Sequence, residues 1–135
     1  MLFLVAMVLL TSNIMAETIA ATDSRVTFVG RAEVEDGSLR FDWPATYFRV
    51  AFTGKSLAMR VSDNKRNYYA VWVDMPTSAE PTRIVEVKGN DTIIDLVLAA
   101  DVKKSKVKEH QVVIQKRTEA GCGTTTVHAF MTDGR

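Results

Sequence analysis

The sequence predicts an all-β domain, a sandwich or barrel of about nine short strands. Apolar and polar residues alternate with a period of two over many short segments, and Gly, Pro, Asp and Asn recur between those segments. No segment shows the apolar spacing of a helix of three turns. Because successive side chains of a strand point to opposite faces, the alternation gives each strand one face for a common core.

Residues 40–74 carry the clearest pattern. Two apolar triplets flank a turn at 53–55, where Gly54 supplies the positive φ of a short hairpin loop. A polar turn at 62–67 leads to a third strand at 67–74, so these segments predict a three-stranded meander. The triplets expected to meet in one core are Phe48, Val50, Phe52 and Leu57, Met59, Val61, and the third strand has Tyr69, Val71, Val73 on one face and Tyr68, Ala70, Trp72 on the other.

The other strands follow the same rule. Turns are expected at Asp36-Gly37 and at 89–91, and Pro44 is expected at a strand end because it cannot donate to a ladder. Loops are expected at 75–81, 101–109 and 118–123. The remaining strands are predicted at 26–29, 31–35, 39–42, 83–88, 92–99, 110–117 and 124–131.

The amino terminus differs from the rest of the chain. Residues 1–10 are apolar and Ala16 offers a small residue at a cleavage position, so residues 1–16 are predicted to be a signal peptide. The alternative is a buried amino-terminal strand or helix. The apolar run is too short to span a bilayer as a helix. We therefore expect a mobile lead-in at 17–24, a β-sandwich domain at 25–135, and a secreted or periplasmic protein.

Composition narrows the functional classes. The chain has 135 residues and a net charge of +1, with 47% hydrophobic and 24% charged residues, which is typical of one globular domain. The balanced charge argues against nucleic acid and against a membrane as partners once the signal is removed. Four lysines at 103, 104, 106 and 108 are expected in a solvated loop, with a polyanion contact as the alternative.

No residue pattern indicates catalysis or a metal site. His110 and His128 are the only histidines, and neither has the spacing of a zinc ligand set, so no metal and no cofactor are expected. No serine lies in a nucleophile motif, and His128 is expected to be a hydrogen-bonded strand residue. Cys122 is the single cysteine, expected to be buried and inert rather than a reactive thiol.

The aromatic residues are the remaining functional signal. Tyr68 and Trp72 share one strand face, and with Tyr47 or Trp43 they would form a stacking platform for sugar rings. The alternative is that these rings pack in a core or against another domain. The two alternatives differ in whether the rings are exposed.

Several short motifs occur along the chain in a fixed order and spacing. They are Gly30-Arg31, RFDWP at 40–44, FTGKSL at 52–57, Asn67-Tyr68-Tyr69, Val73-Asp74, His110-Gln111-Val112 and KRTEA at 116–120. In this order and spacing, residues 26–134 resemble the amino-terminal jelly-roll domain of family 2 carbohydrate esterases. The resemblance implies a jelly-roll β-sandwich of antiparallel strands that precedes an SGNH (GDSL-type) hydrolase domain, which removes acetyl groups from xylan or similar polysaccharides.

The resemblance implies no catalytic residue in this sequence. The nucleophile block, the oxyanion-hole residues and the catalytic His belong to the hydrolase domain, whose linker would begin at Arg135. We therefore expect a non-catalytic domain whose partners are that hydrolase domain and, as a second possibility, polysaccharide. Arg117 and Glu119 flank Thr118 at a strand end, where they form either a structural ion pair or a docking surface for the hydrolase. The competing hypotheses are a stand-alone carbohydrate-binding module and a purely structural assembly domain.

Overall fold

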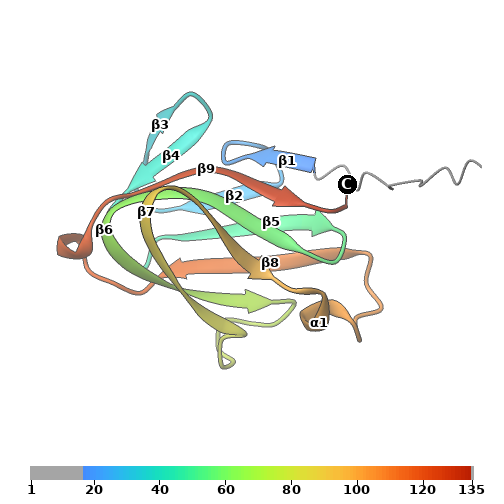
Figure 1. The fold of residues 1–135 in the computed structure, drawn as a ribbon. Coiled ribbons are helices and arrows are strands. Elements are labelled where there is room, and N and C mark those ends of the chain that lie inside the picture. Colours follow the sequence, from blue (N-terminus) through green and yellow to red (C-terminus); the bar gives the residue numbers. More distant parts are fainter. Residues whose placement is uncertain (1–16, 135) are drawn as a thin grey trace, which may run out of the picture.

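The computed structural model describes residues 17–134, which form nine antiparallel strands and two short helices (Figure 1). Most connections between the strands are short. The strands are β1 (Glu17–Ala20), β2 (Val26–Val29), β3 (Glu33–Glu35), β4 (Ser38–Phe41), β5 (Tyr47–Thr53), β6 (Leu57–Val73), β7 (Arg83–Val97), β8 (Glu109–Lys116) and β9 (Thr125–Thr132), and the helices are α1 (Ala99–Val102) and the 3-10 helix η1 (Ala120–Cys122).

Two long strands, β6 and β7, run through both layers of the fold and join them into one curled sheet (Figure 1). The second half of β6 pairs with β8, and β8 continues through β5 to β2. The first half of β6 pairs with β9, which is flanked on its other edge by β1 and by the β3–β4 hairpin. The predicted all-β antiparallel sandwich is confirmed.

The core lies between the two layers and contains the predicted apolar faces. Phe48, Phe52, Met59 and Phe130 are fully or almost fully buried, and Phe48 packs edge-on against Phe130 with ring centroids 5.7 Å apart. Tyr69, Val71 and Val73 of β6 face this core, while Ala70 and Trp72 belong to a second, smaller cluster on the outer face. The period of two therefore assigned every one of these side chains to the correct face.

The predicted hairpin between residues 48 and 61 is wrong in its pairing. β5 bonds to β2 and β8, whereas the first half of β6 bonds to β7 and β9. The connection at Gly54, which has φ +125°, carries the chain from one layer to the other. Both triplets still reach one core because they approach it from opposite layers. Alternation determines the face of a strand, but it does not choose the hydrogen-bonding partner.

Two predicted turns are bends inside continuous strands. The β6–β7 ladder shifts register between Val61 and Asp63 and again between Asp63 and Arg66, where the pair of strands passes from one layer to the other. The predicted turn at 89–91 is the matching bend of β7, with positive φ at Gly89 and Asp91. The polar residues recognised as turn signals therefore mark irregular β-structure, which increases local bending and twist.

The expected lead-in at 17–24 contains a strand. β1 pairs with β9 from Glu17↔Thr132 to Ala20↔Ala129, and Ile19 is fully buried. The Arg25 guanidinium lies 2.7 Å from Glu17 and 3.0 Å from Asp23, so ion pairs tie the segment after β1 back to it. The predicted signal peptide at 1–16 lies outside the described residues. Among helices of residues 17–134, none has the length and apolarity needed to cross a membrane.

Some of the remaining predictions are confirmed, and others are wrong. The loops at 75–81 and 118–123 are confirmed, the second containing η1. The loop predicted at 101–109 begins with the last two residues of α1. Its four lysines, at 103, 104, 106 and 108, are exposed and make no ion pair to another described residue. Cys122 is half-buried in η1 rather than buried. His128 bonds to Ser38 and Ser62, as expected for a strand histidine.

Candidate functional site

Tyr68 and Trp72 lie on the outer face of β6, but they do not form an open platform. Trp72 is only 7% exposed, packs with Ala70 and Val113, and donates its indole N–H to the carbonyl of Ala79 at 2.9 Å. Tyr68 is half-buried, and its hydroxyl donates to Glu86 at 3.1 Å. The loop after β6 therefore covers Trp72, and its ring offers no free face to a ligand.

Trp43 lies elsewhere, in the loop between β4 and β5. Its side chain is 54% exposed, and the Arg31 guanidinium carbon lies 5.6 Å from the ring centroid. The ring lines a cavity of about 340 Å³ together with Arg31, Glu33, Arg40, Asp42 and Thr124. Neither Tyr68 nor Trp72 lines this cavity, so the structure separates the aromatic residues that the sequence had grouped.

A second cavity adjoins the first. It has a volume of about 470 Å³ and shares Arg40 and Thr124 with the Trp43 cavity. Its other walls are polar and come from β3, from the bends of β6 and β7, and from β9. These residues are Glu35, Ser62, Asp63, Asn64, Asn90 and Thr126. Sequence reasoning missed this group because its members lie on four segments that only the strand pairing brings together.

A buried polar network lies beneath the bend of β6. Asp63 Oδ2 accepts hydrogen bonds at 2.7 Å from Asn67 Nδ2 and from Thr125 Oγ1, and the Tyr69 hydroxyl donates to Thr125 at 2.7 Å. Burial raises the pKa of Tyr69 far above its usual value. All members of the network are bonded, so it secures the bend and leaves no group free for chemistry.

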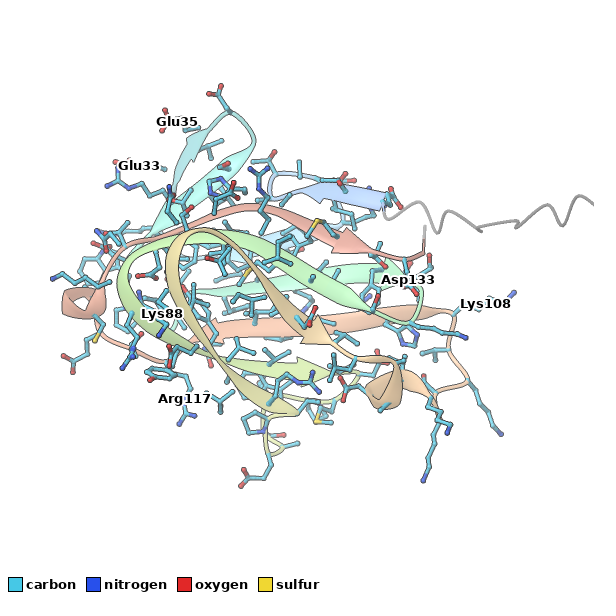
Figure 2. All side chains as sticks on the ribbon, viewed as in Figure 1. Glu33, Glu35, Lys88, Lys108, Arg117 and Asp133 are labelled. Carbon is cyan, nitrogen blue, oxygen red and sulfur yellow. The ribbon has the colours of Figure 1, made fainter. Side chains whose placement is uncertain are left out.

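Arg117 and Glu119 lie past the end of β8, and both are exposed. Within residues 17–134, no ion pair joins their side chains. Instead the neighbouring Lys116 Nζ donates to the carbonyls of Thr118 at 2.7 Å and Glu119 at 3.1 Å. Figure 2 shows Arg117 below and to the left of Asp133, past the end of β8.

A third cavity lies beside the last described residues. It has a volume of about 930 Å³ and an apolar wall of Ala99, Ala100, Val102 and Val107, and it also includes Lys55 and His110; we call it the terminal cavity. The Asp133 carboxylate accepts the N–H groups of Lys55 and Ser56 at 2.8 and 3.0 Å. Burial alone raises the pKa of Asp133, but these donors outweigh burial and hold the pKa below its usual value.

The two histidines have structural partners. His110 Nδ1 lies 2.6 Å from Asp74, which also accepts the N–H of Gln111. His128 Nε2 lies 2.9 Å from Ser62 Oγ, but its second nitrogen faces Ser38 rather than a carboxylate. Ser62 Oγ also accepts the N–H of Asp91 at 2.9 Å, so this serine holds β6 to β7. A nucleophile–base–acid arrangement is not formed by these groups.

No group of three or more His, Cys, Asp or Glu within residues 17–134 is arranged to hold a metal ion.

The sequence and the fold of this chain are similar to those of known proteins. The family model described as carbohydrate esterase 2 N-terminal matches residues 28–135. Among solved structures, a family two carbohydrate esterase from Cellvibrio japonicus is similar at 24% identity and a TM-score of 0.74, covering 89% of this chain and 34% of that chain. An acetyl xylan esterase from the rumen bacterium Butyrivibrio proteoclasticus is similar at 12% identity and a TM-score of 0.69, covering 89% and 32%.

These two likenesses show the shared fold, and the chain spans about a third of the length of each esterase. A third likeness is to the CBM36-1 domain of a multidomain xylanase from the hindgut metagenome of Trinervitermes trinervoides. It has 8% identity and a TM-score of 0.59, and covers 86% of this chain and 94% of that domain. No curated protein matches the chain in sequence.

Proposed function

Because this chain belongs to the N-terminal domain family of family 2 carbohydrate esterases, we propose that it is the non-catalytic β-sandwich domain of a secreted enzyme that deacetylates polysaccharides such as xylan. In this proposal the domain packs against an SGNH hydrolase domain, which carries the nucleophile. The observation that carries the proposal is the family match over residues 28–135. The similar esterase structures are about three times as long as the matched region, which leaves room in them for a second domain.

The terminal cavity is the surface that best fits a docked domain. Val107 is 54% exposed and Leu98, just before α1, is 46% exposed, so apolar side chains remain open to solvent at this end. The cavity lies next to Asp133, so a domain joined after this residue would begin beside it. Arg117 and Glu119, the docking residues suggested by the sequence, lie at the other end of β8.

The proposal is tested by comparing the chain alone with the chain joined to its hydrolase domain, which DNA sequencing downstream of the Arg135 codon would identify. The chain alone is expected to release no acetate from acetylated xylo-oligosaccharides or from an aryl acetate, whereas the joined protein is expected to be active. Deacetylation by the chain alone would refute the non-catalytic role. Failure of the separately produced domains to form a complex in size-exclusion chromatography with light scattering would refute the docking role.

A second candidate function is carbohydrate binding by the domain itself. The likeness to a CBM36-1 domain, which this chain covers over 94% of its length, favours that candidate at the level of the fold. A stacking platform needs an exposed aromatic ring. Among the four residues proposed for the platform, Trp43 is exposed, whereas Tyr47 and Tyr68 are half-buried and Trp72 is buried. A glycan-binding measurement on the chain alone tests this second function independently of the first, because docking requires no glycan affinity.

A further inference from the structure

We propose that the two adjoining cavities beside the β3–β4 hairpin form one binding groove for a neutral oligosaccharide, with Trp43 as its stacking surface. We call this surface the hairpin groove and define it by Glu33, Arg40, Trp43, Asn64, Asn90 and Thr124. This inference gives a place and a ligand class to the second candidate function. It does not depend on the docking of a hydrolase domain.

The two compartments of the groove adjoin. Arg40 and Thr124 line both cavities, so a ligand that occupies both would pass these two side chains. The compartments measure about 340 and 470 Å³, and each is within the range of small-ligand sites. A chain of linked sugar rings fits this division better than a single compact ligand, because successive rings would occupy successive compartments.

Trp43 supplies the apolar part of the groove. The Arg31 guanidinium lies over the indole at 5.6 Å, a cation–π distance that holds the ring in place. More than half of the side chain nevertheless stays exposed, at 54%. An exposed indole in a polar cavity has ring surface to offer to the C–H face of a sugar, which is apolar while the sugar edges carry hydroxyl groups.

The polar residues of the groove have free hydrogen-bonding capacity. Asn64 Oδ1 accepts the N–H of Thr124 at 2.7 Å and Asn90 Oδ1 accepts from Ser62 at 3.1 Å, while neither side-chain NH₂ group has a partner within residues 17–134. The Arg40 guanidinium makes one ion pair among the same residues, to Glu33 at 4.0 Å. Two amides and a guanidinium therefore present donors to a ligand rich in hydroxyl oxygens.

Hydrogen bonds inside the fold order the floor of the groove before any ligand arrives. Ser62 on β6 bonds to His128 on β9 at 2.9 Å and accepts the N–H of Asp91 on β7 at 2.9 Å. The Arg60–Asp91 pair, with its closest atoms 2.5 Å apart, ties β6 to β7 at the same place. Because these contacts are already made, binding a ligand requires little further ordering of the floor, which favours affinity.

The groove has charges of both signs, with more carboxylates than cations. Arg31 and Arg40 line it together with the carboxylates of Glu33, Glu35, Asp42 and Asp63. The exposed lysines at 103, 104, 106 and 108, which would attract an anion, lie in the loop that borders the terminal cavity. The carboxylates of the groove do not favour a polyanion, and the mixture of groups suits a neutral ligand that accepts from arginine and donates to carboxylates.

The position of the groove keeps it accessible. Figure 2 shows Glu33 and Glu35 at the upper left of the molecule and Lys108 and Asp133 at its right-hand end. A domain docked at the terminal cavity would therefore leave the hairpin groove open. Glycan binding and docking could then occur in the same molecule, and a failure of one would not imply a failure of the other.

Isothermal titration of the chain with cellohexaose, xylohexaose and mannohexaose tests the proposal, with tri-galacturonate as the anionic comparison. At least one neutral hexasaccharide is expected to bind with a Kd below about 1 mM, and more tightly than tri-galacturonate. Trp43→Ala is expected to weaken this binding by about tenfold or more, and Arg40→Ala by about fivefold. Trp43→Phe, which keeps an aromatic ring, is expected to retain most of the affinity.

Two control variants separate this groove from the rest of the surface. Arg49→Ala removes an exposed arginine of β5, in the other layer, and Tyr68→Ala removes the ring of the platform suggested by the sequence; neither is expected to change the affinity. Thermal melting confirms that each variant is folded. Absence of binding by all three neutral hexasaccharides, equal or tighter binding of tri-galacturonate, or a loss caused by Tyr68→Ala but not by Trp43→Ala would overturn the proposal.

Discussion

The ammonium group of Lys116 is buried in the interior of the protein. The residue is 1% exposed, and its Nζ satisfies the carbonyls of Thr118 and Glu119 in the turn before η1. Burial lowers the pKa of Lys116, because the charged form loses hydration. The side chain therefore fixes the turn at residues 118–119, inside the KRTEA motif, and its role is structural.

Replacing Lys116 by Met keeps most of the side-chain volume but leaves two carbonyls without their donor. The free energy of unfolding is expected to fall by about 1–3 kcal/mol, the cost of unsatisfied buried polar groups. Lys103→Met, at an exposed position, is the matched control and is expected to stay within about 0.5 kcal/mol of the parent. Urea denaturation measures the free energy of unfolding of both variants. Equal stability of the two variants would contradict the role given to Lys116.

Asp23 makes stability depend on pH in the acid range. The hydrogen bond from the Arg25 guanidinium, followed by that from the Arg25 N–H, lowers the pKa of Asp23 to about 2, compared with about 3.9 in an unfolded chain. Since the folded pKa is the lower one, this stabilisation is present above about pH 4 and is lost as the pH falls toward about 2.

Asp23→Asn removes the carboxyl group that titrates in this pH range. The variant is expected to melt below the parent at pH 6, and the difference between the two melting temperatures is expected to shrink as the pH approaches 2. Differential scanning calorimetry from pH 2 to pH 6 follows both proteins. A difference that stays constant over this range would show that the Asp23–Arg25 pair does not titrate as its geometry implies.

At the scale of the elements, the connection from β5 to β6 determines how the two layers are joined. Gly54 has φ +125°, and a Cβ atom at this position would lie 2.6 Å from Asp133 Oδ1 and 2.7 Å from the N atom of Gly134. Only glycine meets both the backbone conformation and the close approach. The residue predicted to close a hairpin is thus required for a different reason, as the crossing point between layers.

Gly54→Ala is expected to lower the free energy of unfolding by about 1–3 kcal/mol or more, from backbone strain and from the clash with backbone atoms. Gly121→Ala is the matched control, because an added Cβ there meets no heavy atom within 4 Å. Chemical denaturation compares the two. If Gly54→Ala were no less stable than Gly121→Ala, the close packing of this connection would be refuted.

At the scale of the whole molecule, the terminal cavity and the hairpin groove lie at different ends and differ in chemistry. The first is bordered by Val102, Val107 and exposed lysines, and the second is polar with one exposed indole. Apolar side chains left open at one end of a domain are typical of a surface that another protein covers. The two proposed roles, docking and glycan binding, therefore fall on separate surfaces.

Val107→Asp is expected to weaken association with the hydrolase domain by about tenfold or more, because it places a charge in the apolar wall of the terminal cavity. Val34→Asp is the control, since Val34 is 67% exposed on the β3–β4 hairpin at the far end. Both positions are exposed, so both variants are expected to fold. Surface plasmon resonance measures the two affinities, and the reverse order would place the contact on the hairpin instead.

The sequence predicted the members of the candidate site less well than it predicted the fold. It singled out Trp43 but grouped it with Tyr68 and Trp72, because spacing along one strand shows a shared face and not whether another segment covers that face. Asn64, Asn90 and Thr124 carried no signal, since an isolated polar residue at a bend is typical of any turn. Only the pairing of β6 with both β7 and β9 brings them to one surface.

The sequence by itself determined the strand class, the positions of most strands, and which side chains face the core, because alternation with a period of two is a local consequence of extended backbone geometry. The tertiary structure alone decided that β5 pairs with β8 rather than with β6, that β6 and β7 bend through both layers, and that β1 completes the edge of β9. These choices depend on partners many residues apart in the chain. Hydrogen bonds between strands form at any register that local patterns permit, and only the packing of the complete core selects one of them.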